Sequence, residues 1–236
     1  MKRISYRFSR VMLRALALCH FATAAEPVYD PDVRMPRPLD LVINDQQRSR
    51  EIPLRVYLAK AGTPAPIVLF SHGLGGSREG NAFMGKHWAA RGFVVVFLQH
   101  PGSDDSVWKD TPLALRMSAM QRAASLQNFL LRVKDVPTVL DELARWNKTE
   151  GHPLAGQLDL DRIGMSGHSF GAVTTQAVSG QSFARGGPAL TDERISAAIA
   201  FSPSGARDGA DPSQVFGKVK IPWMLMTGTK DASPIG

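Results

Sequence analysis

The stretch Gly167-His168-Ser169-Phe170-Gly171 constrains the fold more than any other part of the sequence. The short run 162–165 before it predicts a strand, and residues 172–178 after it have apolar positions at helical spacing. A Gly-x-Ser-x-Gly pentapeptide between a strand and a helix is typical of a sharp turn that lifts the serine hydroxyl clear of the backbone. Without that context, the pentapeptide would fit an ordinary glycine-rich turn equally well.

A second glycine-rich turn, Ser71-His72-Gly73-Leu74-Gly75-Gly76, directly follows the apolar run 66–70. Glycines in such a turn allow the backbone to approach a substrate closely, so that its amides can stabilise a developing negative charge. We therefore predict that the backbone N–H groups of Leu74 and Phe170 form an oxyanion hole. The alternative is a strand-end turn without a chemical role.

Together, the two motifs resemble those of the bacterial α/β-hydrolases grouped as dienelactone-hydrolase-like, and those of the platelet-activating-factor acetylhydrolases. Dienelactone hydrolases proper use a cysteine nucleophile, whereas position 169 is serine, so the acetylhydrolase-like esterases are the better comparison. The resemblance covers residues 38–236 and implies an α/β-hydrolase fold with a mostly parallel central sheet and helices on both faces. It also implies a Ser-His-Asp triad, no metal or cofactor, and ester substrates with short to medium acyl groups.

Apolar runs and their spacing predict the remaining elements. We expect an edge hairpin, then buried strands, and helices that end at glycines or polar connections. The expected strands are 39–43, 52–58, 67–70, 93–98, 195–201 and 221–227, and the expected helices are 81–91 and 135–146. The segment 113–131 also has helical periodicity, and it fits either a lid-like insertion near the cleft or a plain crossover helix.

The N-terminus has the layout of a secretory signal peptide. Residues 1–25 have a basic start, a mainly apolar middle and a small-residue cleavage site, although Arg14 interrupts the apolar run. The alternative is an unprocessed amphipathic helix, and the run is too short for a membrane span. We therefore expect a secreted or periplasmic protein, with an extended arm at 26–37 and a single domain at 38–236.

Charge and cysteine content exclude several classes of function once this leader is removed. The formal charge is +7, and residues 1–25 contain five Lys/Arg and no Asp/Glu, which leaves 7 − 5 = +2 on the mature chain. No basic stripe indicates a nucleic-acid partner. Cys19, the only cysteine, lies in the leader, so the sequence predicts neither a disulfide nor a cysteine-based metal site. The expected partner is a small-molecule or lipid-like ester.

A serine nucleophile requires a base, and the base requires an orienting carboxylate. We favour Asp231 as this acid because it follows the expected strand 221–227. In the acetylhydrolases the acid follows the preceding strand instead. There this chain has Ser202-Pro203-Ser204, and no carboxylate before Asp208 and Asp211. Asp231 as a turn-capping residue is the alternative.

The base is missing from its expected place. In this fold the catalytic histidine follows the acid, yet the six histidines (His20, His72, His87, His100, His152, His168) all precede Asp231. We expect His168 to point into the structure and His100 to line the cleft without acting as the base. The sequence therefore predicts a fragment that lacks its last strand, the loop with the base and a final helix.

The loop after the expected strand 93–98 contains further polar and aromatic residues, but they give weaker evidence for a functional site. The adjacent Asp104 and Asp105 are expected to be solvated loop residues rather than a catalytic pair or a metal site. Trp108 fits either a substrate pocket or core packing.

These features favour a serine hydrolase that cleaves carboxylic esters through an acyl-enzyme at Ser169. An amidase or peptidase on the same fold is the alternative within the enzymes. A non-catalytic module that binds ligands in the cleft is the alternative outside them, if the chain truly ends at residue 236.

Overall fold

The computed structural model describes residues 37–60, 62–182, 190–206 and 210–231. These residues include most of the expected domain at 38–236. The expected signal peptide at 1–25 lies outside them, as does almost all of the expected arm at 26–37.

Seven strands of the described chain form one sheet in the order β1-β2-β4-β3-β5-β6-β7. β2 pairs antiparallel with both β1 and β4, and every other neighbouring pair is parallel. This confirms the predicted mostly parallel sheet with a hairpin at its edge. The strands are β1 (Leu39–Asp45), β2 (Arg50–Tyr57), β3 (Ala65–Ser71), β4 (Val94–Leu98), β5 (Leu158–His168), β6 (Ile195–Phe201) and β7 (Trp223–Met226).

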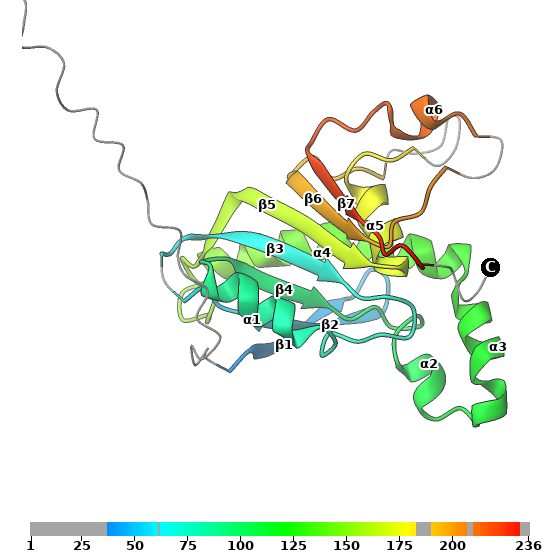
Figure 1. The fold of residues 1–236 in the computed structure, drawn as a ribbon. Helices are drawn as coiled ribbons and strands as arrows, with labels where there is room; N and C mark the ends of the chain where they lie inside the picture. The colour runs from blue at the N-terminus through cyan, green and yellow to red at the C-terminus, as the bar shows by residue number, and fades with distance from the viewer. Residues whose placement is uncertain (1–36, 61, 183–189, 207–209, 232–236) are drawn as a thin grey trace, which may run out of the picture.

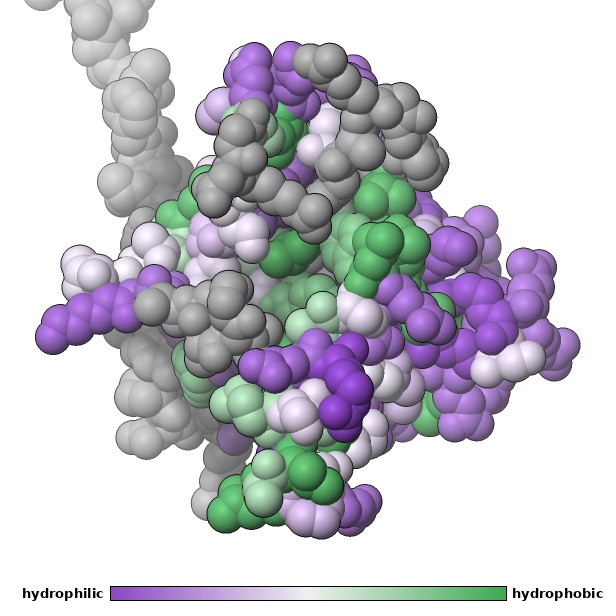
Figure 2. Space-filling view, turned by 90° about the vertical axis from the view of Figure 1, so that its right-hand side faces the viewer, coloured by the Kyte–Doolittle hydropathy of each residue, from purple (hydrophilic) through white to green (hydrophobic). Residues whose placement is uncertain are grey.

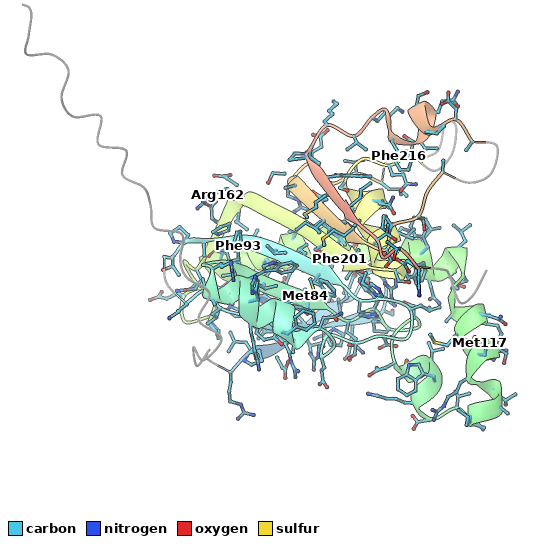
Figure 3. The ribbon with its side chains drawn as sticks, viewed as in Figure 1. Met84, Phe93, Met117, Arg162, Phe201 and Phe216 are labelled. Carbon is cyan, nitrogen blue, oxygen red and sulfur yellow. The ribbon has the colours of Figure 1, made fainter. Side chains whose placement is uncertain are left out.

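Helices cover both faces of the sheet, as predicted. In Figure 1, α1 (Ala82–Ala90) lies in front of the sheet, and α4 (Leu126–Lys148) and α5 (Phe170–Val178) lie behind it. Because successive strand residues point to opposite faces, β3 contributes Leu69 to the core cluster that contains residues of α4 and α5, and Phe70 to the smaller cluster that packs on α1. Met84 and Phe93, on the α1 side in Figure 3, pack against this smaller cluster.

The predicted boundaries at 113–131 and 135–146 are wrong. The structure has α2 (Ser106–Lys109), then α3 (Leu113–Ala123), and then one long helix, α4, that includes Pro137. Ser125 starts α4, where its Oγ accepts a hydrogen bond from the backbone N–H of Asn128 at 3.2 Å. Residues around Pro137 pack fully into the core, and this burial outweighs the helix hydrogen bond that proline removes.

The segment 113–131 is therefore divided between an inserted helix, α3, and the start of the crossover helix, α4. α4 is the crossover between β4 and β5, whereas α2 and α3 project beside the carboxyl ends of the strands (Figure 1). Leu113 and Met117 of α3 are 79% and 55% exposed. Figure 2, turned toward the side that carries α2 and α3, shows hydrophobic patches between the polar areas. Within the described chain, no helix is both long and apolar enough to cross a membrane.

The far edge of the sheet is formed by β7. Its side chains Met224, Leu225 and Met226 are 54%, 55% and 43% exposed. The one described neighbour of this strand is β6, so its outer backbone N–H and C=O groups are unpaired within the described sheet and lie beside exposed apolar side chains. The short helix α6 (Pro212–Phe216) lies in the connection between these two strands.

Candidate active site

The turn after β5 has the geometry that the sequence predicts. Ser169 lies between β5 and α5 with φ 54° and ψ −116°, a combination that few residues other than glycine adopt. Its N–H donates to the carbonyl of Phe201, at the end of β6, at 2.9 Å. A Cβ at Gly167 would collide with the carbonyl of Gly171, and one at Gly171 would collide with the carbonyl of Ser71. Both glycines are therefore required by close backbone contacts.

The glycine-rich turn after β3 faces this serine across a small pocket. The pocket has a volume of about 230 Å³. His72, Gly73 and Leu74 line one part of it, and His168 and Ser169 line another. The structure thus brings together two motifs that are far apart in the sequence.

Two backbone donors, one on the pocket lining and one next to Ser169, have no acceptor among the described residues. The N–H of Leu74 makes no hydrogen bond there, although its neighbours Gly75 and Gly76 donate to the carbonyls of Ser103 and Gly73 at 2.9 and 3.0 Å. Phe170 is the first residue of α5, so its N–H has no partner within the helix. Both groups remain available to an acceptor from outside the chain.

Asp231 lies at the same end of the sheet. Its carboxylate accepts a hydrogen bond from Thr227 Oγ1 at 2.9 Å, just past the end of β7. The hydroxyls of Ser202 and Thr227 lower the pKa of Asp231, and a smaller contribution comes from His168. Asp231 is therefore an exposed, ionised carboxylate on the ligand-binding edge of the sheet.

The alternative acids have different positions. Asp211 caps α6, where its carboxylate accepts hydrogen bonds from the N–H and Oγ of Ser213 at 2.9 and 2.8 Å. Asp208 lies outside the described residues.

Among the described residues, no histidine ring is hydrogen-bonded to Ser169 Oγ. We expected His168 to point into the structure, and this prediction is wrong. The residue is exposed and lines the pocket. The reason is that β5 continues to residue 168, which lies one position beyond the buried end of the strand and is exposed. The base thus remains unassigned in this part of the chain.

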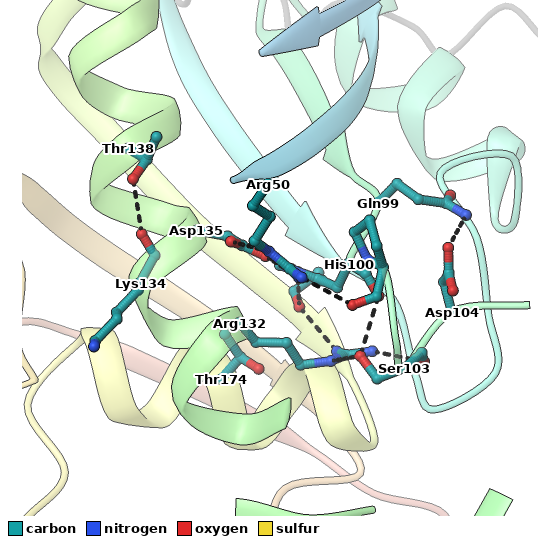
Figure 4. A network of polar contacts seen from close by, with 12 residues as sticks. Arg50, Gln99, His100, Ser103, Asp104, Arg132, Lys134, Asp135, Thr138 and Thr174 are labelled. Atoms are coloured by element: carbon teal, nitrogen blue, oxygen red, sulfur yellow. Dashed lines mark hydrogen bonds and ion pairs between the residues drawn. The ribbon is translucent and has the colours of Figure 1, made fainter. Parts of the chain in front are cut away.

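We expected His100 to line the cleft, and this prediction is wrong. The residue is completely buried. Its Nε2 lies 2.9 Å from Ser71 Oγ and its Nδ1 lies 2.9 Å from Asp135 Oδ2, which forms a Ser-His-Asp arrangement that does not include Ser169. His100 and Asp135 are labelled in Figure 4. Burial, reinforced by the charge of Arg132, lowers the pKa of His100 to about 4. Burial alone would raise the pKa of Asp135, but hydrogen bonds from His100 and Arg50 lower it to about 2. The histidine is therefore neutral and the carboxylate ionised at neutral pH.

The hydrogen bond from the His100 backbone determines the protonation state of His72, whose Nδ1 also lies 3.2 Å from Arg132 Nη2. The backbone N–H of His100 donates to His72 Nε2 at 3.1 Å, so this nitrogen carries no proton. The opposite nitrogen, Nδ1, then donates to the carbonyl of Gly73 at 2.7 Å. Burial, and then the charge of Arg132, holds the pKa of His72 well below its usual value. His72 is thus a neutral hydrogen-bond donor to the glycine-rich turn.

Two other expectations also need correction. Asp104 is buried rather than solvated, because Gln99 Nε2 and Ser106 Oγ donate to its carboxylate at 2.7 and 2.5 Å. Trp108 belongs neither to the core clusters nor to the pocket lining, since its Nε1 donates to the carbonyl of Gly75 at 2.7 Å. Both residues therefore support the loops around the pocket.

Arg132 and Asp135 of α4 were not predicted from the sequence. One signal was available: the two residues are three positions apart and precede an apolar helix face that continues with Val136, Val139 and Leu140. Charged residues on such a face are buried together, and they require polar partners there.

Comparisons with known proteins agree with this architecture. Residues 55–111 match the family model of platelet-activating factor acetylhydrolase, isoform II. This region includes the glycine-rich turn after β3 and ends before Ser169. A search of curated proteins finds no match.

Solved structures show the same fold at low sequence identity. An acylaminoacyl peptidase from Pyrococcus horikoshii aligns with 83% of this chain and 32% of its own, at 16% identity and a TM-score of 0.54. A provisionally assigned dienelactone hydrolase from Klebsiella pneumoniae aligns over 84% and 75%, at 16% identity and a TM-score of 0.58. A ferulic acid esterase from Streptomyces cinnamoneus aligns over 88% and 69%, at 19% identity and a TM-score of 0.50.

The chain has an α/β-hydrolase fold, and the comparisons support its resemblance to the serine esterase group within that fold. It spans 32% of the length of the two acylaminoacyl peptidases that it matches first.

Proposed function

We propose that this protein is a serine hydrolase that cleaves carboxylic esters through an acyl-enzyme intermediate. One observation carries the proposal. Ser169 has the strained backbone of a nucleophile elbow, and the N–H groups of Leu74 and Phe170 have no acceptor beside the pocket that Ser169 lines. A non-glycine residue with this backbone conformation is uncommon in an ordinary structural turn.

In this mechanism Ser169 Oγ gives its proton to the base and attacks the ester carbonyl, whose oxygen becomes negatively charged in the tetrahedral intermediate. The ester C–O bond then breaks, the leaving alcohol takes the proton from the base, and water later hydrolyses the acyl-enzyme. The N–H groups of Leu74 and Phe170 then donate to that oxygen. Such donors contribute most in the transition state, because the charge is largest there. The N-terminus of α5 adds its positive dipole end on the same side.

Asp231 is the proposed acid of the triad. It lies just after β7 at the carboxyl end of the sheet, and it is ionised, as a group that orients a histidine must be. The base in this proposal is a histidine supplied by a longer form of the protein. Two features of the described chain motivate this part of the proposal. No histidine is hydrogen-bonded to Ser169, and β7 has no described neighbour on its outer side.

The size of the pocket favours substrates with short to medium acyl groups. A volume of about 230 Å³ accommodates a small acyl chain, and exposed apolar residues of α3 lie on the adjoining segment. Ester and amide hydrolysis share the same acyl-enzyme chemistry, so the leaving group has to be determined by experiment.

The test uses protein expressed from its complete reading frame, with p-nitrophenyl esters of graded acyl length and a matched p-nitroanilide. A fluorophosphonate probe is expected to label Ser169 alone, and the Ser169→Ala variant is expected to lose both labelling and turnover while it stays folded. Esters are expected to be cleaved faster than the anilide. Labelling or ester cleavage that persists in Ser169→Ala would exclude this nucleophile.

A further inference from the structure

Arg132 on α4 is fully buried, and within the described chain it has no ion-pair partner. This distinguishes it from Arg48 and Arg50, which both pair with the carboxylate of Asp135. A buried guanidinium is costly unless its N–H groups are hydrogen-bonded. Its partners should therefore show why the charge is kept at this place.

The hydrogen bonds of Arg132 go to the glycine-rich turn and to Ser103, and Figure 4 shows Arg132 beside Ser103. Nη1 donates to the carbonyl of His72 at 2.7 Å, and Nη2 reaches that of Gly73 at 3.4 Å. Nε donates to Ser103 Oγ at 2.8 Å, and Nη2 also reaches the Ser103 carbonyl at 3.3 Å. That carbonyl in turn accepts from the N–H of Gly75. Arg132 thus holds the chain on both sides of Leu74.

These contacts also determine the direction of the Leu74 N–H, because the peptide bond is planar. Gly73 C=O and Leu74 N–H belong to one planar trans peptide, so they point in opposite directions. The Gly73 oxygen is held on one side by Arg132 Nη2, by His72 Nδ1 at 2.7 Å and by the Gly76 N–H at 3.0 Å. The Leu74 N–H is therefore directed to the other side of the peptide plane.

Arg132 also contacts the other side of the candidate oxyanion hole. Its guanidinium carbon lies 4.5 Å from the centre of the Phe170 ring, within the range of a cation–π contact. One side chain from α4 thus contacts the Phe170 ring and the carbonyl of Gly73, which belongs to the same peptide as the Leu74 N–H.

We propose that Arg132 is a positioning residue that sets the oxyanion hole by fixing the Gly73–Leu74 peptide and the Phe170 side chain. This inference rests on the proposed function. Arg132 does not touch the substrate in this role but acts through the two backbone donors.

The test compares Arg132→Met with Arg48→Gln in the protein from the complete reading frame. Arg48 also binds α4, at Asp135 and Thr138, but it makes no contact with the glycine-rich turn, so it is a matched control. Active sites are counted by fluorophosphonate labelling of Ser169 carried to completion. Dividing the turnover rate by this count gives a kcat that is not lowered by unfolded protein. We expect kcat per labelled site to fall at least ~30-fold in Arg132→Met, toward the ~10²–10³-fold effect of losing an oxyanion donor, with KM little changed.

A second readout probes the oxyanion hole itself. Phenylboronic acid forms a tetrahedral adduct with an active serine, and we expect its affinity to fall in parallel with kcat in Arg132→Met but not in Arg48→Gln. Arg132→Lys keeps the charge but cannot reproduce the planar fork, so both quantities should take intermediate values.

Equal kcat and boronate affinity in folded Arg132→Met and Arg48→Gln would overturn the proposal. If Arg132→Met does not fold, Arg132→Lys decides in the same way, and wild-type kcat and boronate affinity in that variant would overturn it. Wild-type protein that is not labelled at Ser169 would instead overturn the proposed function, and this inference with it.

Discussion

Two serines of this chain lie near the same end of the sheet, and their surroundings are opposite. Ser71, at the end of β3, is fully buried and has a histidine and an aspartate aligned behind it at hydrogen-bond distance. Ser169, after β5, lines a pocket beside two free backbone donors, but no described histidine binds it. The complete Ser-His-Asp arrangement is thus at the serine that no substrate can reach.

The comparison shows that a hydrogen-bonded Ser-His-Asp set is not sufficient for catalysis. A general base must accept a proton near neutral pH, whereas burial lowers the pKa of His100 to about 4. The Ser71 hydroxyl is also closed off from any ester by its burial, whereas Ser169 borders a pocket. The buried set instead connects β3 to α4 and supports the turn that faces Ser169.

The two regions are in direct contact at Gly171, and the largest predicted effect tests that contact. A Cβ at Gly171 would collide with the carbonyl of Ser71, so Gly171→Ala should push the elbow and β3 apart. We expect a loss of several kcal/mol, about the size that overpacking of a core can reach, or no folded protein. Gly164→Ala in β5 is the control, because a Cβ there meets its nearest atom at 3.7 Å. Thermal unfolding of both variants measures the difference, and equal melting temperatures would contradict the contact.

Acid sensitivity is the next effect in size. In the unfolded chain His100 binds a proton below its ordinary pKa of 6.5, but in the folded protein only below about 4. The unfolded state binds more protons in this window, so the free energy of unfolding should fall by about 3 kcal/mol as the pH drops through it. Asp135, with its pKa lowered from 3.8 to about 2, should add a further loss below that window.

Denaturant titrations between pH 7 and pH 4 measure this loss, and His100→Asn is the matched variant. The asparagine amide can still donate to Asp135 but does not titrate, so its stability should vary less between pH 6.5 and pH 4. The same pH dependence in both proteins would show that His100 is not the source.

The smallest effect concerns Ser71 itself. Ser71→Ala leaves His100 Nε2 without its hydroxyl partner, which should cost about 1–3 kcal/mol of stability. Fluorophosphonate labelling of Ser169 should be retained in this variant, because Ser71 does not line the pocket and its hydroxyl is only a distant partner of Arg132, at 3.4 Å. Loss of labelling in a folded Ser71→Ala protein would contradict the separation of the two regions.

The sequence by itself determined the elements whose signal is local. The Gly-x-Ser-x-Gly pentapeptide defined the elbow because two close backbone contacts allow only glycine at positions 167 and 171. Continuous apolar runs defined β3 and β4, since strands buried on both faces need no alternation. The order of the two motifs was enough to predict the α/β-hydrolase fold, and the turn with Leu74 does line the same pocket as Ser169.

Only the tertiary structure decided the state of the polar residues. His100 and Arg132 have ordinary loop or helix sequences around them, and their side chains are paired with partners 29 to 61 residues away. α4 likewise continues through Pro137 because the sheet packs against it, which no local propensity indicates. Burial and pairing are properties of contacts between distant segments, so the buried triad and the support of the oxyanion turn became visible only when the chain was folded.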